Sequence, residues 1–73
     1  MKFANEKSIY AGMIVRTDEG GETKLLTTIP IFVLAINKQQ AAVNIVAKYT
    51  QLKGHSRYDV ETDQCLVSEL QYT

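Results

Sequence analysis

The sequence predicts an α+β fold in the order β-β-α-β-β, with an antiparallel sheet and one amphipathic helix packed on one of its faces. Three observations predict it: apolar residues alternate over residues 9–17, a Gly-Gly turn follows them, and apolar residues recur at helical spacing over residues 37–53. The chain has 73 residues, of which 45% are hydrophobic and 22% charged, a composition that argues against disorder. We therefore expect a single small domain over residues 1–73.

The first two strands are predicted to form a hairpin centred on Gly20 and Gly21. Residues 9–17 alternate between one face made by Ile9, Ala11, Met13 and Val15 and another made by Tyr10, Gly12, Ile14 and Arg16. The motif DEGGE then supplies two glycines, which adopt the positive φ angles of a tight turn without steric cost. The chain returns through residues 23–36, which are rich in Thr, Ile and Val and therefore suit a strand.

Pro30 interrupts the returning strand. Because proline has no N–H to offer a sheet, we expect a bulge, an edge position or a break between two strand segments there. The run IFVLAI after it is apolar on both faces. The side chains of this run form two alternating sets, and one of the two should pack against the helix: Phe32, Leu34 and Ile36, or else Ile31, Val33 and Ala35. The other set needs a different cover, and we expect a second subunit in a homodimer or larger oligomer.

The helix is predicted over residues 38–53. Asn37 is a favourable N-cap, and Gln40 at the third helical position can reach back in a variant of the capping box. Gly54 stands where a left-handed C-cap commonly ends a helix. The predicted core face is made by Ala41, Ala42, Ile45, Val46, Tyr49 and Leu52.

Two shorter segments complete the predicted fold. Residues 56–62 alternate, with Tyr58 and Val60 on one face and Arg57, Asp59 and Glu61 on the other, and this pattern predicts a strand. The motif TDQ then turns the chain. Residues 65–70 return as a last strand; alternatively, residues 66–72 form one or two helical turns.

No motif for catalysis, metal binding or cofactor binding is found. His55 and Cys65, with Asp59 as an orienting acid, could in principle form a nucleophile and base pair, but Cys65 lies in an apolar strand pattern typical of a buried, inert thiol. One Cys and one His do not provide the paired spacing of a zinc site, and EGGE is no phosphate-binding loop. We therefore expect a protein without enzymatic activity, cofactor or metal.

The first residues and the longest apolar run bear on localisation. The opening MKFANEKSIY lacks the apolar core of a signal peptide. The longest apolar run, IPIFVLAI, is far shorter than the roughly 18 residues that cross a bilayer. We expect a cytoplasmic protein with no membrane partner.

The charges are segregated although their sum is zero. Residues 1–22 carry a net −1, residues 23–58 a net +5 without any acid, and residues 59–73 a net −4. Such asymmetry marks a binding surface unless the fold interleaves the segments. A nucleic-acid interface is the alternative use of the basic residues beside Tyr49 and Tyr58, although the pI near 6.5 argues against it. The residues predicted to bind a partner are Lys48, Lys53, His55, Arg57, Tyr58, Asp59 and Glu61.

The central run resembles small phage-encoded inhibitors, such as anti-CRISPR proteins and phage inhibitors of host RNA polymerase. The matching elements lie within residues 30–60: PIFVLAI, NKQQ, AAVNIVAKY, KGH and RYDV. In that pattern an apolar strand runs through a polar cap into an alanine-containing helix, a glycine loop and another strand. The resemblance implies a protein that occludes a larger host nucleic-acid-processing protein through surface charge and shape. The resemblance assigns no functional residue to this chain.

Overall fold

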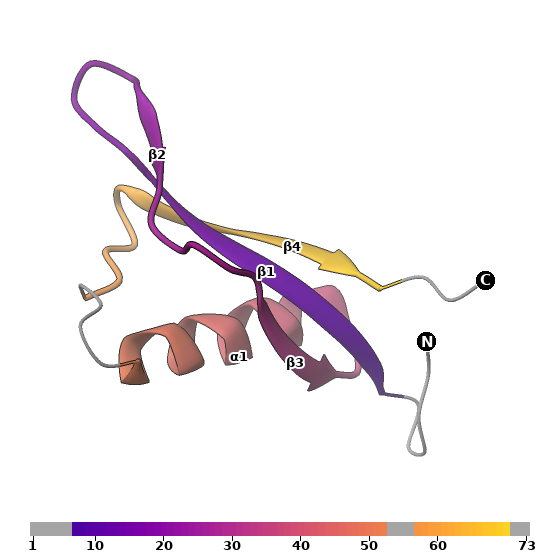
Figure 1. The fold of residues 1–73 in the computed structure, drawn as a ribbon. Coiled ribbons are helices and arrows are strands. Elements are labelled where there is room, and N and C mark those ends of the chain that lie inside the picture. The colour runs from indigo at the N-terminus through magenta and orange to yellow at the C-terminus, as the bar shows by residue number, and fades with distance from the viewer. Residues whose placement is uncertain (1–6, 53–56, 71–73) are drawn as a thin grey trace.

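The computed structural model describes residues 7–52 and 57–70. They form an antiparallel four-stranded sheet with one helix, in the order β1 (Ser8–Thr17), β2 (Thr23–Leu25), β3 (Ile31–Ala35), α1 (Lys38–Gln51) and β4 (Asp63–Glu69). Figure 1 shows the helix lying across one face of the sheet, with the β1–β2 hairpin projecting beyond it. The α+β class and the single helix packed on one face are therefore confirmed.

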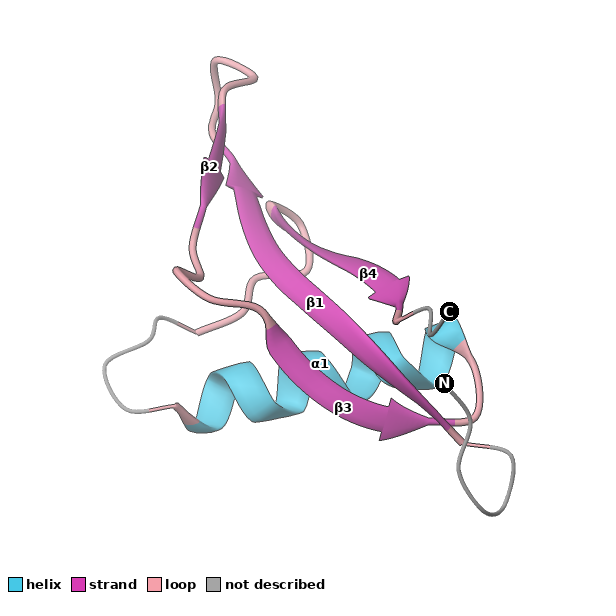
Figure 2. Cartoon of the chain, turned by 45° about the vertical axis from the view of Figure 1, so that its right-hand side comes forward, coloured by secondary structure: helices cyan, strands magenta, loops and turns pink. Residues whose placement is uncertain are grey.

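The long strand β1 is the centre of the sheet, as Figure 2 shows. Along one edge, β3 pairs with the first half of β1 and β2 pairs with its last residues. Along the other edge, β4 pairs with β1 from Tyr10 opposite Glu69 to Arg16 opposite Asp63. Three strands thus precede the helix and one follows it, because the predicted second strand is split and residues 57–61 form no strand. The last segment is a strand rather than helical turns.

The hairpin turn forms where the glycines predict it. The Gly21 N–H donates to the Asp18 carbonyl at 3.0 Å, and the Asp18 N–H donates to the Glu22 carbonyl at 2.9 Å. Gly21 has a φ of 83°, so this position requires the left-handed conformation that glycine adopts freely. The result is a three-residue hairpin loop.

Pro30 marks the break between β2 and β3. In this gap β1 makes two hydrogen bonds to the segment between β2 and β3, and one of them is to a side chain. The Ile14 N–H donates to the Thr27 hydroxyl at 3.2 Å, and the Leu26 N–H donates to the Ile14 carbonyl at 2.7 Å. Thr27 is buried. Its hydroxyl replaces a main-chain acceptor, so the broken strand leaves the Ile14 N–H satisfied.

The helix begins as the sequence predicts. Asn37 is the N-cap, and its side-chain oxygen accepts from the Gln40 N–H at 2.7 Å. The Gln40 side chain reaches back to accept from the Ile36 N–H at 3.0 Å, one residue before the position that the capping box uses. The helix ends at Gln51, and Leu52 is an extended C-cap that is 40% exposed instead of belonging to the core face. Gly54, the predicted C-cap, lies outside the described residues.

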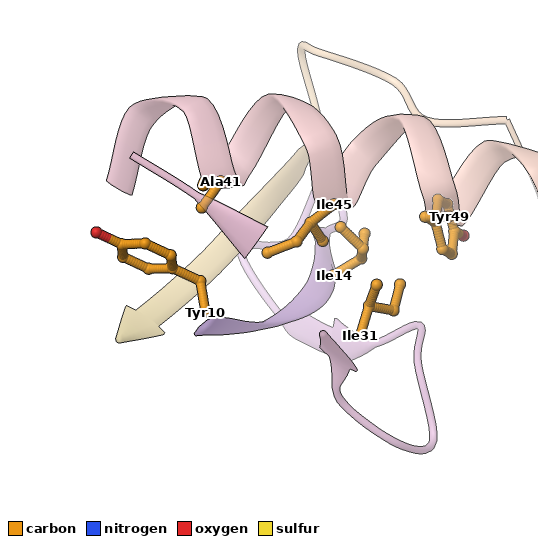
Figure 3. Close-up of a cluster of buried hydrophobic side chains, with 7 residues drawn as sticks. Tyr10, Ile14, Ile31, Ala41, Ile45 and Tyr49 are labelled. Atoms are coloured by element: carbon orange, nitrogen blue, oxygen red, sulfur yellow. The ribbon is translucent and has the colours of Figure 1, made fainter. Parts of the chain in front are cut away.

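The core lies between α1 and the face of the sheet that β1 presents to it. Figure 3 shows Ile14, Ile31, Ile45 and Tyr49 gathered there, and the full cluster of buried side chains is Tyr10, Ile14, Ile31, Ala35, Ala41, Ile45 and Tyr49. Of the two sets in β3, Ile31, Val33 and Ala35 therefore meet the helix, while Phe32 and Leu34 lie on the opposite face, half exposed.

Helix side chains also cap the outer edge of β3. The Lys48 ammonium donates to the Phe32 carbonyl at 3.1 Å, and the Asn44 amide donates to the Leu34 carbonyl at 3.5 Å. A sheet edge with unpaired carbonyls invites another strand. These two contacts cover that edge of the sheet.

Gly12 sets the distance between the helix and the sheet. It lies in the middle of β1, and a Cβ atom built there would overlap the Cδ1 atom of Ile45 and approach its Cγ2 atom to 3.0 Å. A glycine inside a strand often marks such a close approach. The isoleucine side chain thus occupies the space that a larger residue would need.

We predict that Gly12→Ala destabilises the protein by about 1–3 kcal/mol, because the added methyl overpacks the contact with Ile45. Chemical denaturation measures the loss. Gly20→Ala is the matched control, since a Cβ there meets only an Asp18 oxygen at 3.4 Å. Gly12→Ala combined with Ile45→Val should recover part of the loss, and an equal cost for the two alanine variants would contradict this role of Gly12.

Candidate functional site

The structure brings most of the described members of the predicted partner-binding set into one loop. Arg57, Tyr58, Asp59 and Glu61 lie in residues 57–62, which connect to the start of β4. We call this segment the 57–62 loop. The strand predicted over residues 56–62 is wrong, because its described residues 57–62 form a loop and a turn. Lys53 and His55 lie outside the described residues.

The 57–62 loop is organised around the carboxylate of Asp63. Arg16 donates to it through Nε to Oδ1 at 2.6 Å and through Nη2 to Oδ2 at 2.8 Å, which makes a bidentate ion pair. The Asp59 N–H donates to Oδ2 at 2.9 Å, and the Thr62 hydroxyl donates to Oδ1 at 3.1 Å. The Asp63 side chain is fully buried, and four hydrogen bonds satisfy it.

Further bonds fix the loop backbone. The Asp59 carbonyl accepts from the Asp63 N–H at 2.7 Å and from the Thr62 N–H at 3.2 Å, which closes a turn. The Asp59 side chain accepts from the Glu61 N–H at 2.9 Å, as aspartate commonly does in turns. The Tyr58 hydroxyl donates to the Asp63 carbonyl at 3.1 Å. These bonds explain why the alternation of Tyr58 and Val60 does not extend into a strand.

The ion pair controls the charge of Asp63. The hydrogen bonds from the Arg16 guanidinium lower the pKa of the Asp63 carboxyl from 3.8 to about 2, against the opposing effect of burial. The same contact raises the pKa of Arg16. Both groups therefore stay charged at neutral pH. Burial raises the pKa of the Tyr58 phenol as well, so this hydroxyl remains a donor.

The loop presents an exposed apolar side chain on this fixed frame. Val60 is 84% exposed at the turn, and the charged residues Arg57, Asp59 and Glu61 are exposed around it. A shallow hollow here is lined by Arg16, Arg57, Tyr58, Asp59, Val60 and Thr62. An apolar tip with charged neighbours on a rigid turn can insert into a complementary pocket of a partner protein.

The remaining predicted surfaces differ from their expected form. Lys48 contacts β3, whereas the 57–62 loop adjoins β4 on the opposite side of β1, so Lys48 and Arg57 face different elements. The acidic residues Asp59, Glu61 and Asp63 do not form one continuous negative surface, because Asp63 is buried against Arg16 and the Asp59 side chain accepts from the Glu61 N–H. At this end of the molecule the fold therefore interleaves acids with bases.

Cys65 lies partly buried on β4, and burial raises the pKa of its thiol. A reactive cysteine requires the opposite shift. Residues 7–52 and 57–70 contain no group of three or more side chains arranged to hold a metal ion. The described helix is also too short and too polar to cross a membrane.

Sequence reasoning missed two residues that build the site, Arg16 and Asp63. A signal for the first was present, because Arg16 shares the predicted strand face of Tyr10 and Ile14, where a charge requires a buried partner. Val60 was assigned to a strand face, although it is the most exposed large apolar side chain at this end of the molecule.

Comparisons of the chain with protein-family models, curated proteins and solved structures find no match.

The pH dependence of stability tests the Arg16–Asp63 pair. Because the folded-state pKa of Asp63 lies below its unfolded value, the pair stabilises the fold above about pH 4, and this contribution is lost as the pH falls toward 2. We predict that the free energy of unfolding of the wild type drops by about 2 kcal/mol over this window relative to Asp63→Asn. Glu61→Gln removes an exposed carboxylate of the same loop and should keep the drop. Parallel profiles for the wild type and Asp63→Asn would contradict the assignment.

Proposed function

We propose that this chain is a small protein-binding module that acts without catalysis, and that the 57–62 loop is its principal recognition element. One observation carries the proposal: the loop is fixed by the buried Asp63 carboxylate, yet its tip residue Val60 is 84% exposed. Rigid loops lose little conformational entropy on binding, so an exposed apolar residue on such a loop can contribute fully to affinity.

The charges around Val60 supply specificity. The exposed residues Arg57, Asp59 and Glu61 present both signs of charge near the apolar tip. These charges of both signs favour a partner protein with a small apolar pocket bordered by charges. Complementary charges at the edge of an interface guide association and disfavour other partners. A nucleic-acid backbone, which carries one sign of charge, suits these mixed charges poorly.

The resemblance to small phage-encoded inhibitors suggests the class of partner. In this proposal the loop docks on a larger nucleic-acid-processing protein of a host cell and blocks it by occupying its surface. The size of the chain suits such a role, because a small rigid module can cover a binding site without chemistry of its own.

Site-specific photocrosslinking in bacterial lysate tests the proposal. A photoreactive amino acid replaces Val60 in one variant and Val43 in another; Val43 is the matched control, because it is a valine that is 66% exposed on the helix. We predict a discrete crosslinked protein from position 60 and none from position 43. Equal products from both positions, or none from position 60, would contradict the proposal.

With the captured protein purified, Val60→Ala should weaken its binding about tenfold, which corresponds to about 1.4 kcal/mol. Val43→Ala should leave the affinity unchanged. Asp63→Asn, measured at a temperature where it remains folded, should also weaken binding, because the loop loses its fixed shape. If Val60→Ala binds like the wild type, the loop is not the recognition element.

A further inference from the structure

The face of the sheet opposite α1 is apolar and carries no charge. Cross-strand partners place Ile9 beside Leu34, Ala11 beside Phe32, and Met13 beside Leu66 on this face. We call these six residues the open face. Phe32, Leu34 and Leu66 are each about half exposed, at 50%, 49% and 49%. The described part of the chain contains no helix or strand that covers this face.

The open face has both a projection and a hollow. Phe32 stands on β3, next to the small side chain of Ala11. Beside Phe32, a hollow of about 290 Å³ lies over β1, between Pro30 on the β3 side and β4, and it is lined by Ala11, Gly12, Met13, Pro30, Leu66, Val67 and Ser68. The aromatic ring and the hollow therefore lie side by side on the same surface.

We propose that a second copy of this chain covers the open face in a two-fold symmetric, face-to-face dimer. A two-fold axis parallel to the strands, between Phe32 and the hollow, places the ring of each copy over the hollow of the other. The same residues then make the contact twice, as a closed dimer requires. The assembly is a β-sandwich with a helix on each outer side.

Two properties favour a second copy over another occupant. The open face contains no ionisable side chain, and Gln64 and Ser68 on the same face of β4 are uncharged. The charged neighbour Lys48 lies at the outer edge of β3, where its ammonium donates to the Phe32 carbonyl, so the central parts of two copies meet without like-charge repulsion. The projection and the hollow are present on one chain, so a copy supplies both halves of the fit. β3 pairs with residues 8–12 of β1 and β4 with residues 10–16, so three strands lie side by side only over residues 10–12. The area of the face is therefore well below the roughly 800 Å² per partner of a standard specific interface, and we expect a weak dimer whose population grows with concentration.

Sedimentation equilibrium of the full chain tests the dimer. At about 100 µM we expect a mass near twice the 8.2 kDa of the chain, falling toward one chain on dilution. Leu66→Glu places a charge on the open face and should give a monomer, with the melting temperature that the wild type has at a concentration where it too is monomeric. Val43→Glu, on the exposed side of the helix, is the control and should remain a dimer. A wild-type monomer at all concentrations, or equal behaviour of the two variants, would overturn the proposal.

Crosslinking through a single cysteine tests the geometry. Ala11 lies between Phe32 and Ser68 on the open face, close to the proposed two-fold axis, so Ala11→Cys in a Cys65→Ser background brings the same position of two copies face to face. Packed sheets lie about 10 Å apart, which is too far for a disulfide but within reach of a short bismaleimide, and this reagent should give a covalent dimer. Val43→Cys in the same background should not crosslink. Absence of crosslinking through position 11 overturns the proposed arrangement.

The dimer and the 57–62 loop use different surfaces. Leu66→Glu should therefore still crosslink a partner from position 60, and Val60→Ala should still dimerise. If the dimer does not form, binding through the 57–62 loop can still be tested, and the dimer can be tested if the loop binds no partner.

Discussion

The ion pair between Arg16 and Asp63 joins the end of β1 to the start of β4, 47 residues apart in the sequence. Removing a charge from water costs several kcal/mol, and the cost is offset only when the buried group is fully hydrogen-bonded. Four donors meet this condition for Asp63. A one-residue slip of β4 would move the carboxylate to the other face of the sheet, so the pair also specifies the register of the strand. The shape of the 57–62 loop follows from the same contact.

The sheet has two faces with different roles. One helix covers one face, and Gly12 allows it to approach closely enough to form a dense core. No helix or strand within residues 7–52 and 57–70 covers the opposite face, and the side chains of the open face are apolar. Recognition by the loop and self-association by the open face are compatible, because they occupy separate surfaces.

Much of the fold could be predicted from local sequence signals. The hairpin depends on two glycines, the helix start on Asn37 and Gln40, and the strand break on Pro30. Each of these residues acts on backbone groups close to it in the sequence, so a short stretch of sequence is enough to predict its effect. The sequence left open which face of residues 31–36 meets the helix, because both faces are apolar. That choice depends on packing across β1, where Gly12 admits Ile45.

The site was only partly predictable. Four of its residues were named from charge and aromatic content, but Tyr58 and Val60 alternate in a turn as they would in a strand, so periodicity gave the wrong element. The turn is fixed by Asp63, whose main partner Arg16 lies 47 residues away. The place of Arg16 on a core-facing strand face indicated that it needs a buried partner, but not which residue that partner is. The most direct test of the account is the backbone order of residues 57–62, measured by ¹⁵N relaxation. We predict order parameters near 0.85 in the wild type, as in the strands, and a marked decrease in Asp63→Asn; values below about 0.6 in the wild type would contradict a loop fixed by Asp63.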